Sequence, residues 1–241
     1  MLEIKNLQKN FGSFQAVKNI SFKVDKGEVL GFLGPNGAGK STTMRMVTGF
    51  LPPTSGTVTV CGHDIKDAPV AAKQQMGYLP ENAPSYDTMT VRNFLAFAAE
   101  IRGYGGSQKA SKVQEAIEKC HLKKVDSQII ATLSKGYRQR ACFAQAILHD
   151  PQVLIMDEPT DGLDPNQKHV VREMIKDMSA EKAIVISTHI LEEVEAVCSR
   201  AIIINNGTIV ANETPDKLKS RSDTGRLEDV FRMLTVDKED E

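Results

Sequence analysis

In residues 34–42 the chain reads Gly34-Pro35-Asn36-Gly37-Ala38-Gly39-Lys40-Ser41-Thr42. This segment fits the pattern G-x-x-x-x-G-K-[ST]. It follows an apolar run, 29–33, that has the length of a buried strand, and it leads into 41–47, which has the pattern of the first turns of a helix. A strand, a glycine-rich turn and a helix start together direct backbone N–H groups to one place, at the positive end of a helix dipole. The segment therefore predicts a binding site for a polyphosphate.

Two side chains of this phosphate loop have predicted roles. The ammonium group of Lys40 would reach the β- and γ-phosphates of a nucleotide, and the Ser41 hydroxyl would hold one position of a magnesium ion. A glycine turn that precedes a lysine by chance is the plain alternative, but the flanking strand and helix argue against it. A dinucleotide-binding fingerprint competes weakly, because its third glycine would fall where Thr42 stands.

Composition indicates a soluble globular protein. The chain has 241 residues, of which 41% are hydrophobic and 25% charged, which is enough for one large domain or two small ones. The formal net charge of −1 gives no global field that would attract nucleic acid, so we expect no nucleic-acid partner. The cysteines are far apart and form no C-x-x-C pair, so they are expected to be reduced thiols of a cytosolic protein. These cysteines are Cys61, Cys120, Cys142 and Cys198.

The sequence predicts no segment that crosses a membrane. Its first residues lack the apolar core of a signal peptide, and no apolar run approaches the roughly 20 residues that span a bilayer. Any role at a membrane is therefore expected to depend on a partner protein.

The first half of the chain is predicted to form strands and then a group of helices. Alternating apolar residues predict half-buried strands at 2–8 and 18–24, and another strand is predicted at 57–60, after a proline-rich turn. The chain then becomes helical. Thr90 would cap one helix, and Ser134 would cap another that ends near residue 149.

From residue 153 the pattern of a parallel sheet returns. Short apolar runs at 153–156, 183–186 and 201–204 are separated by helical segments, as expected for buried parallel strands. The segment Asn205-Asn206-Gly207 would form a hairpin turn into a last strand at 208–210. The order is therefore sheet, helical insertion, sheet.

Four further segments place polar residues at the ends of predicted elements. Asp157 and Glu158 follow the strand at 153–156, where Asp157 would hold magnesium through water and Glu158 would orient or deprotonate an attacking water. The other three segments are Leu133-Ser134-Lys135-Gly136-Tyr137-Arg138-Gln139-Arg140, Gly162-Leu163-Asp164-Pro165 and Ser187-Thr188-His189.

These segments and the phosphate loop, in this order, resemble the ATP-binding subunit of ABC transporters over nearly all of the chain. The resemblance implies an α/β P-loop NTPase fold. It would have a RecA-like core with a parallel sheet, an antiparallel β subdomain and a helical insertion.

The resemblance also implies a division of the chain. A single ATPase domain would occupy 1–214, and its helical subdomain would lie at about 81–149. The β subdomain and the RecA-like core would share the rest of that domain, 1–80 and 150–214. The tail, 215–241, would carry one helix at 227–234 and a solvated end at 237–241.

ABC ATPases bind two ATP molecules between two cassettes packed head to tail, which implies a second ATPase subunit as a partner, most simply in a homodimer. Ser134 and the Gly136 backbone would touch the γ-phosphate held by the opposing subunit, and Asp164 would connect the two sites. His189 would contact the γ-phosphate and help to hold the attacking water. Plain alternatives stay open, because Ser134 and Asp164 suit helix N-caps and His189 suits a strand end.

The chain departs from the family pattern at several positions. Phe11 stands where a tyrosine usually stacks on adenine, although it could also be plain core. Lys135 and Tyr137 stand where a glycine and a glutamine are usual in the signature segment, 133–140. Glu81 replaces a usual glutamine, and its carboxylate could ligate magnesium but would also repel a γ-phosphate.

The resemblance thus implies ATP and Mg²⁺ as cofactors, and it assigns residues to three roles. The implied catalytic residues are Glu158, His189 and Lys40. The implied ATP-binding residues are Phe11, Val17, Gly34, Pro35, Asn36, Gly37, Ala38, Gly39, Lys40, Ser41, Thr42, Ser134 and Gly136. The implied metal ligands are Ser41, Asp157 and Glu81.

The departures around 77–82 and 133–140 resemble one branch, the ATP-binding subunits of bacterial ABC-2-type exporters. In this branch the integral-membrane permease is a separate polypeptide, so the chain is expected at the cytoplasmic face of the cell membrane as a peripheral subunit. The permease would dock on the face formed by about 82–104. Phe94, Phe97 and Tyr104 would line that face, or would simply belong to the core of the insertion.

We therefore expect an ATPase coupled to transport. One alternative is a soluble ABC ATPase that acts on a partner outside the membrane, although no basic extension or second cassette is present. Another is a regulatory module that binds ATP without hydrolysing it. A GTPase is not indicated, because no N-K-x-D segment for guanine recognition occurs.

Overall fold

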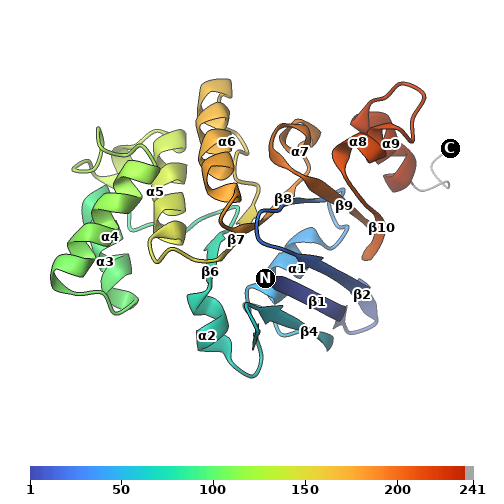
Figure 1. The fold of residues 1–241 in the computed structure, drawn as a ribbon, viewed down its shortest axis with the longest axis horizontal. Coiled ribbons are helices and arrows are strands. Elements are labelled where there is room, and N and C mark those ends of the chain that lie inside the picture. Colours follow the sequence, from blue (N-terminus) through green and yellow to red (C-terminus); the bar gives the residue numbers. More distant parts are fainter. Residues whose placement is uncertain (237–241) are drawn as a thin grey trace.

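The computed structural model describes residues 1–236, and its centre is a six-stranded sheet in the order β10-β9-β3-β8-β7-β6 (Figure 1). Every neighbouring pair is parallel except β9 and β10, which form the predicted hairpin. The strands are β3 (Val29–Leu33), β6 (Met76–Leu79), β7 (Val153–Asp157), β8 (Ala183–Thr188), β9 (Arg200–Asn205) and β10 (Thr208–Glu213). The predicted parallel core is thereby confirmed, and β6 adds an edge strand that the sequence pattern did not reveal.

A second, antiparallel sheet of four strands lies beside the first, in the order β2-β1-β4-β5. Its strands are β1 (Leu2–Phe11), β2 (Phe14–Val24), β4 (Ser55–Val60) and β5 (His63–Asp64). The first two strands are longer than predicted, because they continue as a hairpin in which Phe11 lies opposite Phe14. This extension carries two aromatic rings to the tip of the hairpin.

The helix α1 (Lys40–Val47) joins the two sheets into one core. Its Met44 and Met46 have no exposed surface, and they belong to the same cluster as Ile4 of β1 and Phe32 of β3. Burial of apolar side chains on both sides of α1 fixes the helix start, and therefore fixes the phosphate loop before it.

The helical insertion consists of α3 (Val91–Ile101), α4 (Gly106–Lys119), the short helix η1 (Ile130–Thr132) and α5 (Lys135–Ile147). The predicted caps are present, since the side chains of Thr90 and Ser134 accept hydrogen bonds from the backbone N–H groups of Asn93 and Tyr137.

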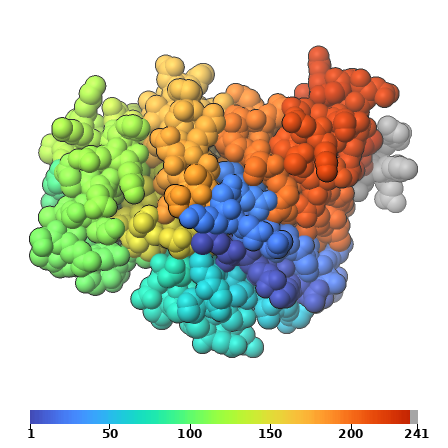
Figure 2. Space-filling model, viewed as in Figure 1, coloured from blue at the N-terminus to red at the C-terminus, as the bar shows by residue number. Residues whose placement is uncertain are grey.

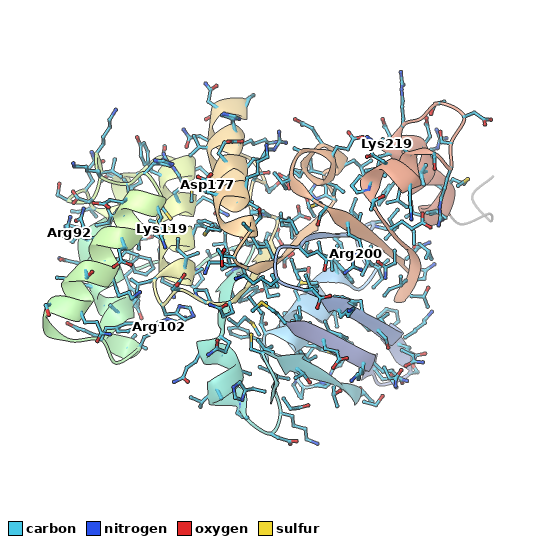
Figure 3. All side chains as sticks on the ribbon, in the orientation of Figure 1. Arg92, Arg102, Lys119, Asp177, Arg200 and Lys219 are labelled. Atoms are coloured by element: carbon cyan, nitrogen blue, oxygen red, sulfur yellow. The ribbon has the colours of Figure 1, made fainter. Side chains whose placement is uncertain are left out.

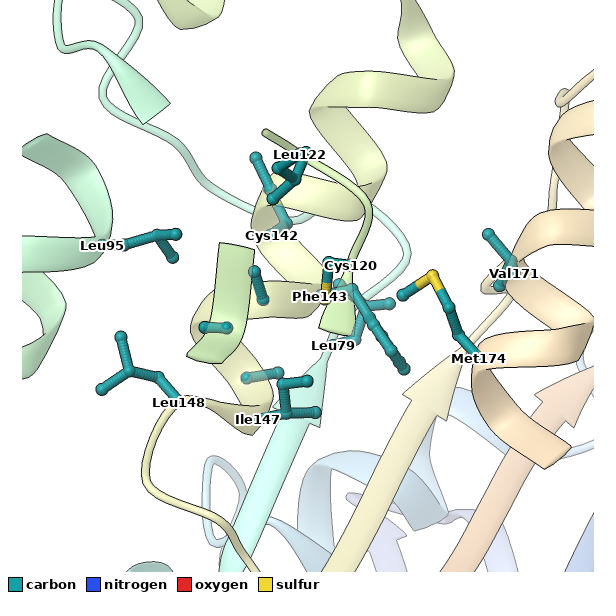
Figure 4. Close-up of a cluster of buried hydrophobic side chains, with 14 of the residues drawn as sticks. Leu79, Leu95, Cys120, Leu122, Cys142, Phe143, Ile147, Leu148, Val171 and Met174 are labelled. Carbon is teal, nitrogen blue, oxygen red and sulfur yellow. The ribbon is translucent and has the colours of Figure 1, made fainter. Parts of the chain in front are cut away.

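The insertion shares its core with the central sheet. Leu95 and Phe143 of the insertion join one buried cluster with Leu79 of β6 and Met174 of α6 (Pro165–Ser179), as Figure 4 shows. In the space-filling view the insertion, in green, flanks one side of the molecule, and the N-terminal strands, in blue, lie below the centre (Figure 2). The division of the chain into subdomains stays a prediction.

The remaining helices are α2 (Pro69–Gln74), α7 (Leu191–Val197), α8 (Pro215–Lys219) and α9 (Leu227–Thr235), of which α9 matches the helix predicted at 227–234. The tail therefore holds two helices and not one, and Thr214 caps the first of them by accepting a hydrogen bond from the Lys217 N–H group. The predicted solvated end, 237–241, lies outside the described residues. Within residues 1–236, no helix combines the length and apolar character that crossing a membrane requires.

Candidate active site

The phosphate loop is pressed against two neighbouring strands. Gly39 has a φ of 105°, and a Cβ atom there would lie 2.7 Å from the Ala16 carbonyl oxygen of β2. A Cβ atom at Gly34 would collide with the Ile204 carbonyl oxygen of β9. Only glycine allows this close approach of backbone to backbone, so both glycines are needed for the curvature of the loop.

Lys40 is folded across its own loop. Its Nζ donates hydrogen bonds to the carbonyl oxygens of Gly34, at 2.6 Å, and Pro35, at 3.1 Å. Burial lowers the pKa of Lys40, whereas the charges of Glu158, Asp157 and Glu81 oppose that change. The ammonium group is therefore held by neutral carbonyls at a place where an anion could bind it more strongly.

An open depression of about 270 Å³ lies over the loop. Two aromatic rings at the tip of the β1–β2 hairpin form one wall, because Phe11 is 50% exposed and Phe14 is 63% exposed. The complete lining is Phe11, Phe14, Ala16, Pro35, Asn36, Gly37, Gly39, Lys40, Ser41 and Thr42. The depression thus offers ring faces at one end and backbone N–H groups at the other.

Val17 does not line the depression, and its part in ATP binding stays a prediction. Val17 has no exposed surface and lies beneath the loop, within 3.4 Å of where a Gly39 Cβ would stand. Ala16, the neighbouring residue of β2, lines the depression instead. Gly34 and Ala38 belong to the loop, but their side-chain positions are buried, so they would contact the phosphates through their backbone. Phe14 was missed, because its partner across the hairpin is visible only once the two strands are paired.

A carboxylate pair stands at the end of the central strands. Asp157 ends β7 and is 5% exposed, and burial raises its pKa, an effect that the nearby Ser187 hydroxyl opposes. The charges of Glu158 and Glu81 raise the pKa of Asp157 further, which places these three carboxyl groups in one region. Glu81, predicted from its position in the sequence, is therefore within electrostatic reach of the site.

These residues suit a magnesium ion that is shared with phosphates. Asp157, Glu81 and Ser41 all offer oxygen atoms, which Mg²⁺ prefers. The buried Ser187 Oγ, beside Asp157, has no hydrogen-bond partner in residues 1–236. The same residues contain no group of three His, Cys, Asp or Glu side chains that could hold a metal alone. The lack of such a group agrees with the coordination of Mg²⁺ in proteins, which usually takes one or two carboxylates together with phosphate oxygens.

Glu158 is held by two donors from the end of β8. His189 Nδ1 donates to Glu158 Oε1 at 2.8 Å, and the Thr188 hydroxyl donates to Oε2 at 3.1 Å. Because a carboxylate only accepts, the Nδ1 atom of His189 must carry the proton. The backbone of Glu158 has a φ of 50°, an uncommon region for a residue with a side chain, and such conformations concentrate at functional sites. The structure thus brings Glu158 and His189 together, and their catalytic roles stay predictions.

The signature segment stands apart from the phosphate loop. In residues 1–236 no hydrogen bond or ion pair joins 133–140 to 34–42, although both segments begin helices. Gly136 packs against the Gln167 side chain of α6, and the Lys135 ammonium lies 3.8 Å from the Asp161 carboxylate. Tyr137 stacks with the Arg140 guanidinium, 4.2 Å from its ring centroid. Asp164 caps α6 by accepting from the Gln167 N–H group.

Sequence reasoning also missed Glu193, which lies in α7 behind the Glu158–His189 pair. Glu193 is 2% exposed, and burial raises its pKa to about 7. The sequence of α7 contains several glutamates, and nothing in it shows that Glu193 is the one that becomes buried. Only the packing of α7 against α6 and the end of β8 reveals it.

This buried carboxyl group predicts a pH dependence of stability. The pKa of Glu193 is higher in the folded chain than its usual 4.5, so ionisation favours unfolding, and stability is lost as the pH rises from about 4.5 through about 7. That difference corresponds to roughly 3 kcal/mol at most. We expect Glu193→Gln, which cannot ionise, to gain free energy of unfolding over the wild type between pH 5 and pH 8. Urea denaturation at both pH values measures the gain, and an equal difference at both values would contradict this prediction.

Comparison with known proteins agrees with the geometry. The ABC transporter family matches residues 17–161. The chain is 38% identical to the uncharacterized ABC transporter ATP-binding protein YxlF of Bacillus subtilis, over 99% of this chain and 78% of that protein. It is also 38% identical to the probable multidrug ABC transporter ATP-binding protein YbhF of Escherichia coli, over 92% of this chain but only 38% of that longer protein.

A solved structure described as the ATP-binding subunit of an ABC transporter has the same fold. It superimposes with a TM-score of 0.86 at 30% sequence identity, and the match covers 97% of this chain and 99% of that one. The family match, the relatives and the fold agree with one another. This chain belongs to the ABC transporter family, as an ATP-binding subunit.

Proposed function

We propose that the chain binds Mg²⁺–ATP in the depression over the phosphate loop and hydrolyses it, and that hydrolysis drives a separate membrane permease. The observation that carries this proposal is the convergence of Lys40, Asp157, Glu158 and Glu81, because the charges of Glu158 and Glu81 act on both Lys40 and Asp157. One cation and three carboxylates around an anion-binding loop suit phosphoryl transfer to water.

Each residue has a distinct part in the proposed reaction. Lys40 exchanges its loop carbonyls for the β- and γ-phosphate oxygens, and the loop N–H groups hold the same oxygens. Glu158 accepts a proton from the attacking water, while His189 holds the carboxylate in orientation. Magnesium, when bound, would supply positive charge that offsets the charge of the phosphates. Asp157 is the main side chain of the protein that would hold it.

A second copy of the chain completes the proposed site. Ser134 and Gly136 begin α5, where N–H groups favour an anion, yet they do not reach the phosphate loop of their own chain. A head-to-tail pair of chains would place each signature segment over the ATP of the other. ATP would then close the pair, and product release would open it.

Phe11 is proposed to stack on the adenine base. We expect Phe11→Ala to raise the dissociation constant for ATP by about 10-fold, because stacking of a base on an aromatic ring contributes roughly 1–3 kcal/mol. A fluorescent ATP analogue measures the affinity in competition. Phe50→Ala is the matched control, since Phe50 is 67% exposed and does not line the depression. Equal affinities for the Phe11→Ala variant and the wild type would show that the base binds elsewhere.

The permease is proposed to dock on an apolar groove of the helical insertion. This groove has a volume of about 530 Å³, and Phe94, Phe97 and the exposed Ile101 line it, as does Tyr86, which the sequence did not single out. Figure 3 shows Arg102, another lining residue, on the lower edge of the insertion. Tyr104, expected here, packs against the buried core of the insertion instead and does not line the groove.

Ile101 provides a test of this docking face. Ile101 is 69% exposed, so Ile101→Asp should leave the fold and ATP binding intact, while it places a charge in the apolar groove. We expect recovery of the permease with the tagged chain to fall by about 10-fold. Met233→Asp is the control, because Met233 is 60% exposed on α9, far from the groove in sequence. Unchanged recovery of the membrane protein would contradict the proposed face.

The export branch and the location follow from the same proposal. The Escherichia coli relative is named as a probable multidrug ABC transporter protein, which supports an exporter, and we propose that this exporter is of the ABC-2 type. The chain would then be a peripheral subunit on the cytoplasmic face of the cell membrane. Phosphate release from Mg²⁺–ATP, together with co-purification of an integral-membrane protein, tests the proposal. Recovery of a non-membrane partner would favour a soluble ABC ATPase.

A further inference from the structure

Lys9 of β1 lies beside the Phe11 ring, and its ammonium group has two contacts. The Nζ atom of Lys9 stands over the Phe11 ring, 5.2 Å from the ring centroid. The same atom donates a hydrogen bond to the Pro52 carbonyl oxygen at 2.8 Å. Within residues 1–236 no carboxylate forms an ion pair with Lys9. The positive charge of Lys9 is therefore not neutralised by a neighbour, and it acts on an aromatic ring.

The turn that accepts this hydrogen bond is itself tied to β1. The Asn10 N–H group donates to the Thr54 hydroxyl at 2.9 Å, and the Thr54 N–H group donates to the Gln8 carbonyl oxygen at 2.9 Å. These hydrogen bonds come from the residues on either side of Lys9, so they hold the Pro52 carbonyl next to its side chain. A lysine side chain has many rotamers when it is free, and this anchor keeps the ammonium group of Lys9 in one position.

The ammonium group reaches the ring from outside the depression over the phosphate loop. Phe11 and Phe14 line that depression, whereas Lys9 does not. Phe11 is 50% exposed, so its ring is not held by burial in the core. A ring that has a cation on one side and lines the depression on the other has a single face to offer to a base.

We propose that Lys9 is a positioning residue for ATP, because its anchored ammonium group holds the Phe11 ring in the orientation that stacks on the base. This inference rests on the proposed binding of ATP in the depression. The cation attracts the π electrons of the ring, so the opposite face becomes less negative and repels the π electrons of a base less. The contact also restricts rotation of an exposed ring before the base arrives, which lowers the cost of ordering it on binding. Lys9 thus acts on the nucleotide only through Phe11.

Removing the charge of Lys9 should weaken the binding of ATP but not that of a triphosphate without a base. Lys9→Met keeps an unbranched side chain, and we expect it to raise the dissociation constant for ATP about 3-fold, within the range of an exposed cation–π contact. Inorganic tripolyphosphate has no base to stack, so it should bind Lys9→Met and the wild type equally. Isothermal titration calorimetry in EDTA, which prevents hydrolysis, measures both ligands. Salt at about 0.15 M screens any long-range attraction between Lys9 and the phosphates.

Further variants isolate the contact between the cation and the ring. Phe11→Leu keeps apolar bulk but has no π face, so Lys9→Met should have no further effect on ATP binding in that background. Lys9→Arg keeps a cation that can lie over an aromatic ring, and it should retain the wild-type affinity for ATP. Lys5→Met is the matched control, because it removes the charge of another lysine of β1, which pairs at the surface with Glu3 at 2.8 Å. It should change the affinity for neither ligand.

The possible results separate this inference from the proposed function. An unchanged ATP affinity in Lys9→Met, or effects of Lys9→Met and Phe11→Leu that simply add, would overturn the role of Lys9. Equal losses of affinity for ATP and tripolyphosphate would also overturn it, because Lys9 would then act on the phosphates and not through the ring. These results would leave the proposed function standing, provided that the wild type binds ATP more tightly than Phe11→Leu does. A wild type that binds no ATP would overturn both.

Discussion

Replacing Glu158 by glutamine is expected to lower kcat for ATP hydrolysis by roughly a thousandfold, within the range that a positioned general base contributes. The amide keeps the size of the carboxylate and can still accept from the Thr188 hydroxyl, so the end of β7 should keep its geometry. It cannot take a proton from water. ATP binding, which depends on the phosphate loop, should therefore survive.

The Glu158→Gln variant should also remain closed around ATP. Because closure is proposed to precede hydrolysis, a chain that binds but does not cleave ATP should accumulate as a pair in Mg²⁺–ATP. Single-turnover phosphate release measures the rate, and analytical ultracentrifugation measures the pair. Glu181→Gln is the control, since Glu181 is 75% exposed and pairs only at the surface with Lys26. Steady-state hydrolysis by Glu158→Gln at the wild-type rate would refute the role of Glu158.

Removing the Lys40 side chain is expected to weaken ATP binding by roughly 100-fold. A charge-assisted hydrogen bond to a phosphate contributes roughly twice as much as a neutral one, and Lys40, which is buried, would donate to two phosphates. Isothermal titration calorimetry with Lys40→Ala measures the loss. Hydrolysis should be lost as well, because the same ammonium offsets charge that develops on the transferred phosphoryl group.

Lys40 also supports the loop, so the test needs a control for structure. Its hydrogen bonds to Gly34 and Pro35 disappear in Lys40→Ala, which could disorder the loop itself. Lys40→Met keeps most of the chain length and packing but removes the charge, and it should lose the same affinity. Lys176→Ala, at an exposed lysine of α6, should lose none. An unchanged ATP affinity in both Lys40 variants would remove Lys40 from the site.

The sequence predicted the parts of the site that depend on neighbours in the chain. The phosphate loop joins a strand to a helix without a break, and Asp157 and Glu158 follow directly on an apolar strand. Local patterns of this kind survive folding, because the elements on both sides are fixed by their own burial. The fold class and the positions of β3, β7, β8 and β9 were therefore predictable.

Residues whose position depends on the pairing of β1 with β2 were less predictable. Val17 was expected at the ATP, yet Ala16 lines the depression and Val17 is fully buried. The register of β1 against β2 shifts on both sides of the Lys9–Val17 pair, so alternation along either strand does not determine which side chain faces the loop. The same irregular hairpin brings Phe14 beside Phe11, and no pattern in either strand alone shows this.

The strand β6 was missed for a physical reason. Its sequence is Met76-Gly77-Tyr78-Leu79, and a glycine inside four residues weakens a strand pattern. In the structure a Cβ atom at Gly77 would collide with the Ala146 carbonyl oxygen of α5, so the glycine allows the helical insertion to lie on the sheet. The weak strand preference of these four residues was thus outweighed by the packing of α5 against β6. The burial of Glu193 has the same origin.

Cleavage of Mg²⁺–ATP by paired sites around Lys40 and Glu158 is tested most directly by phosphate release from the purified wild-type chain. We expect saturable release that requires magnesium and rises with the square of the protein concentration while the pair is scarce. Release should vanish in Glu158→Gln under the same conditions. Release no faster than in buffer alone, or equally fast in Glu158→Gln, would show that the chain does not cleave ATP at this site.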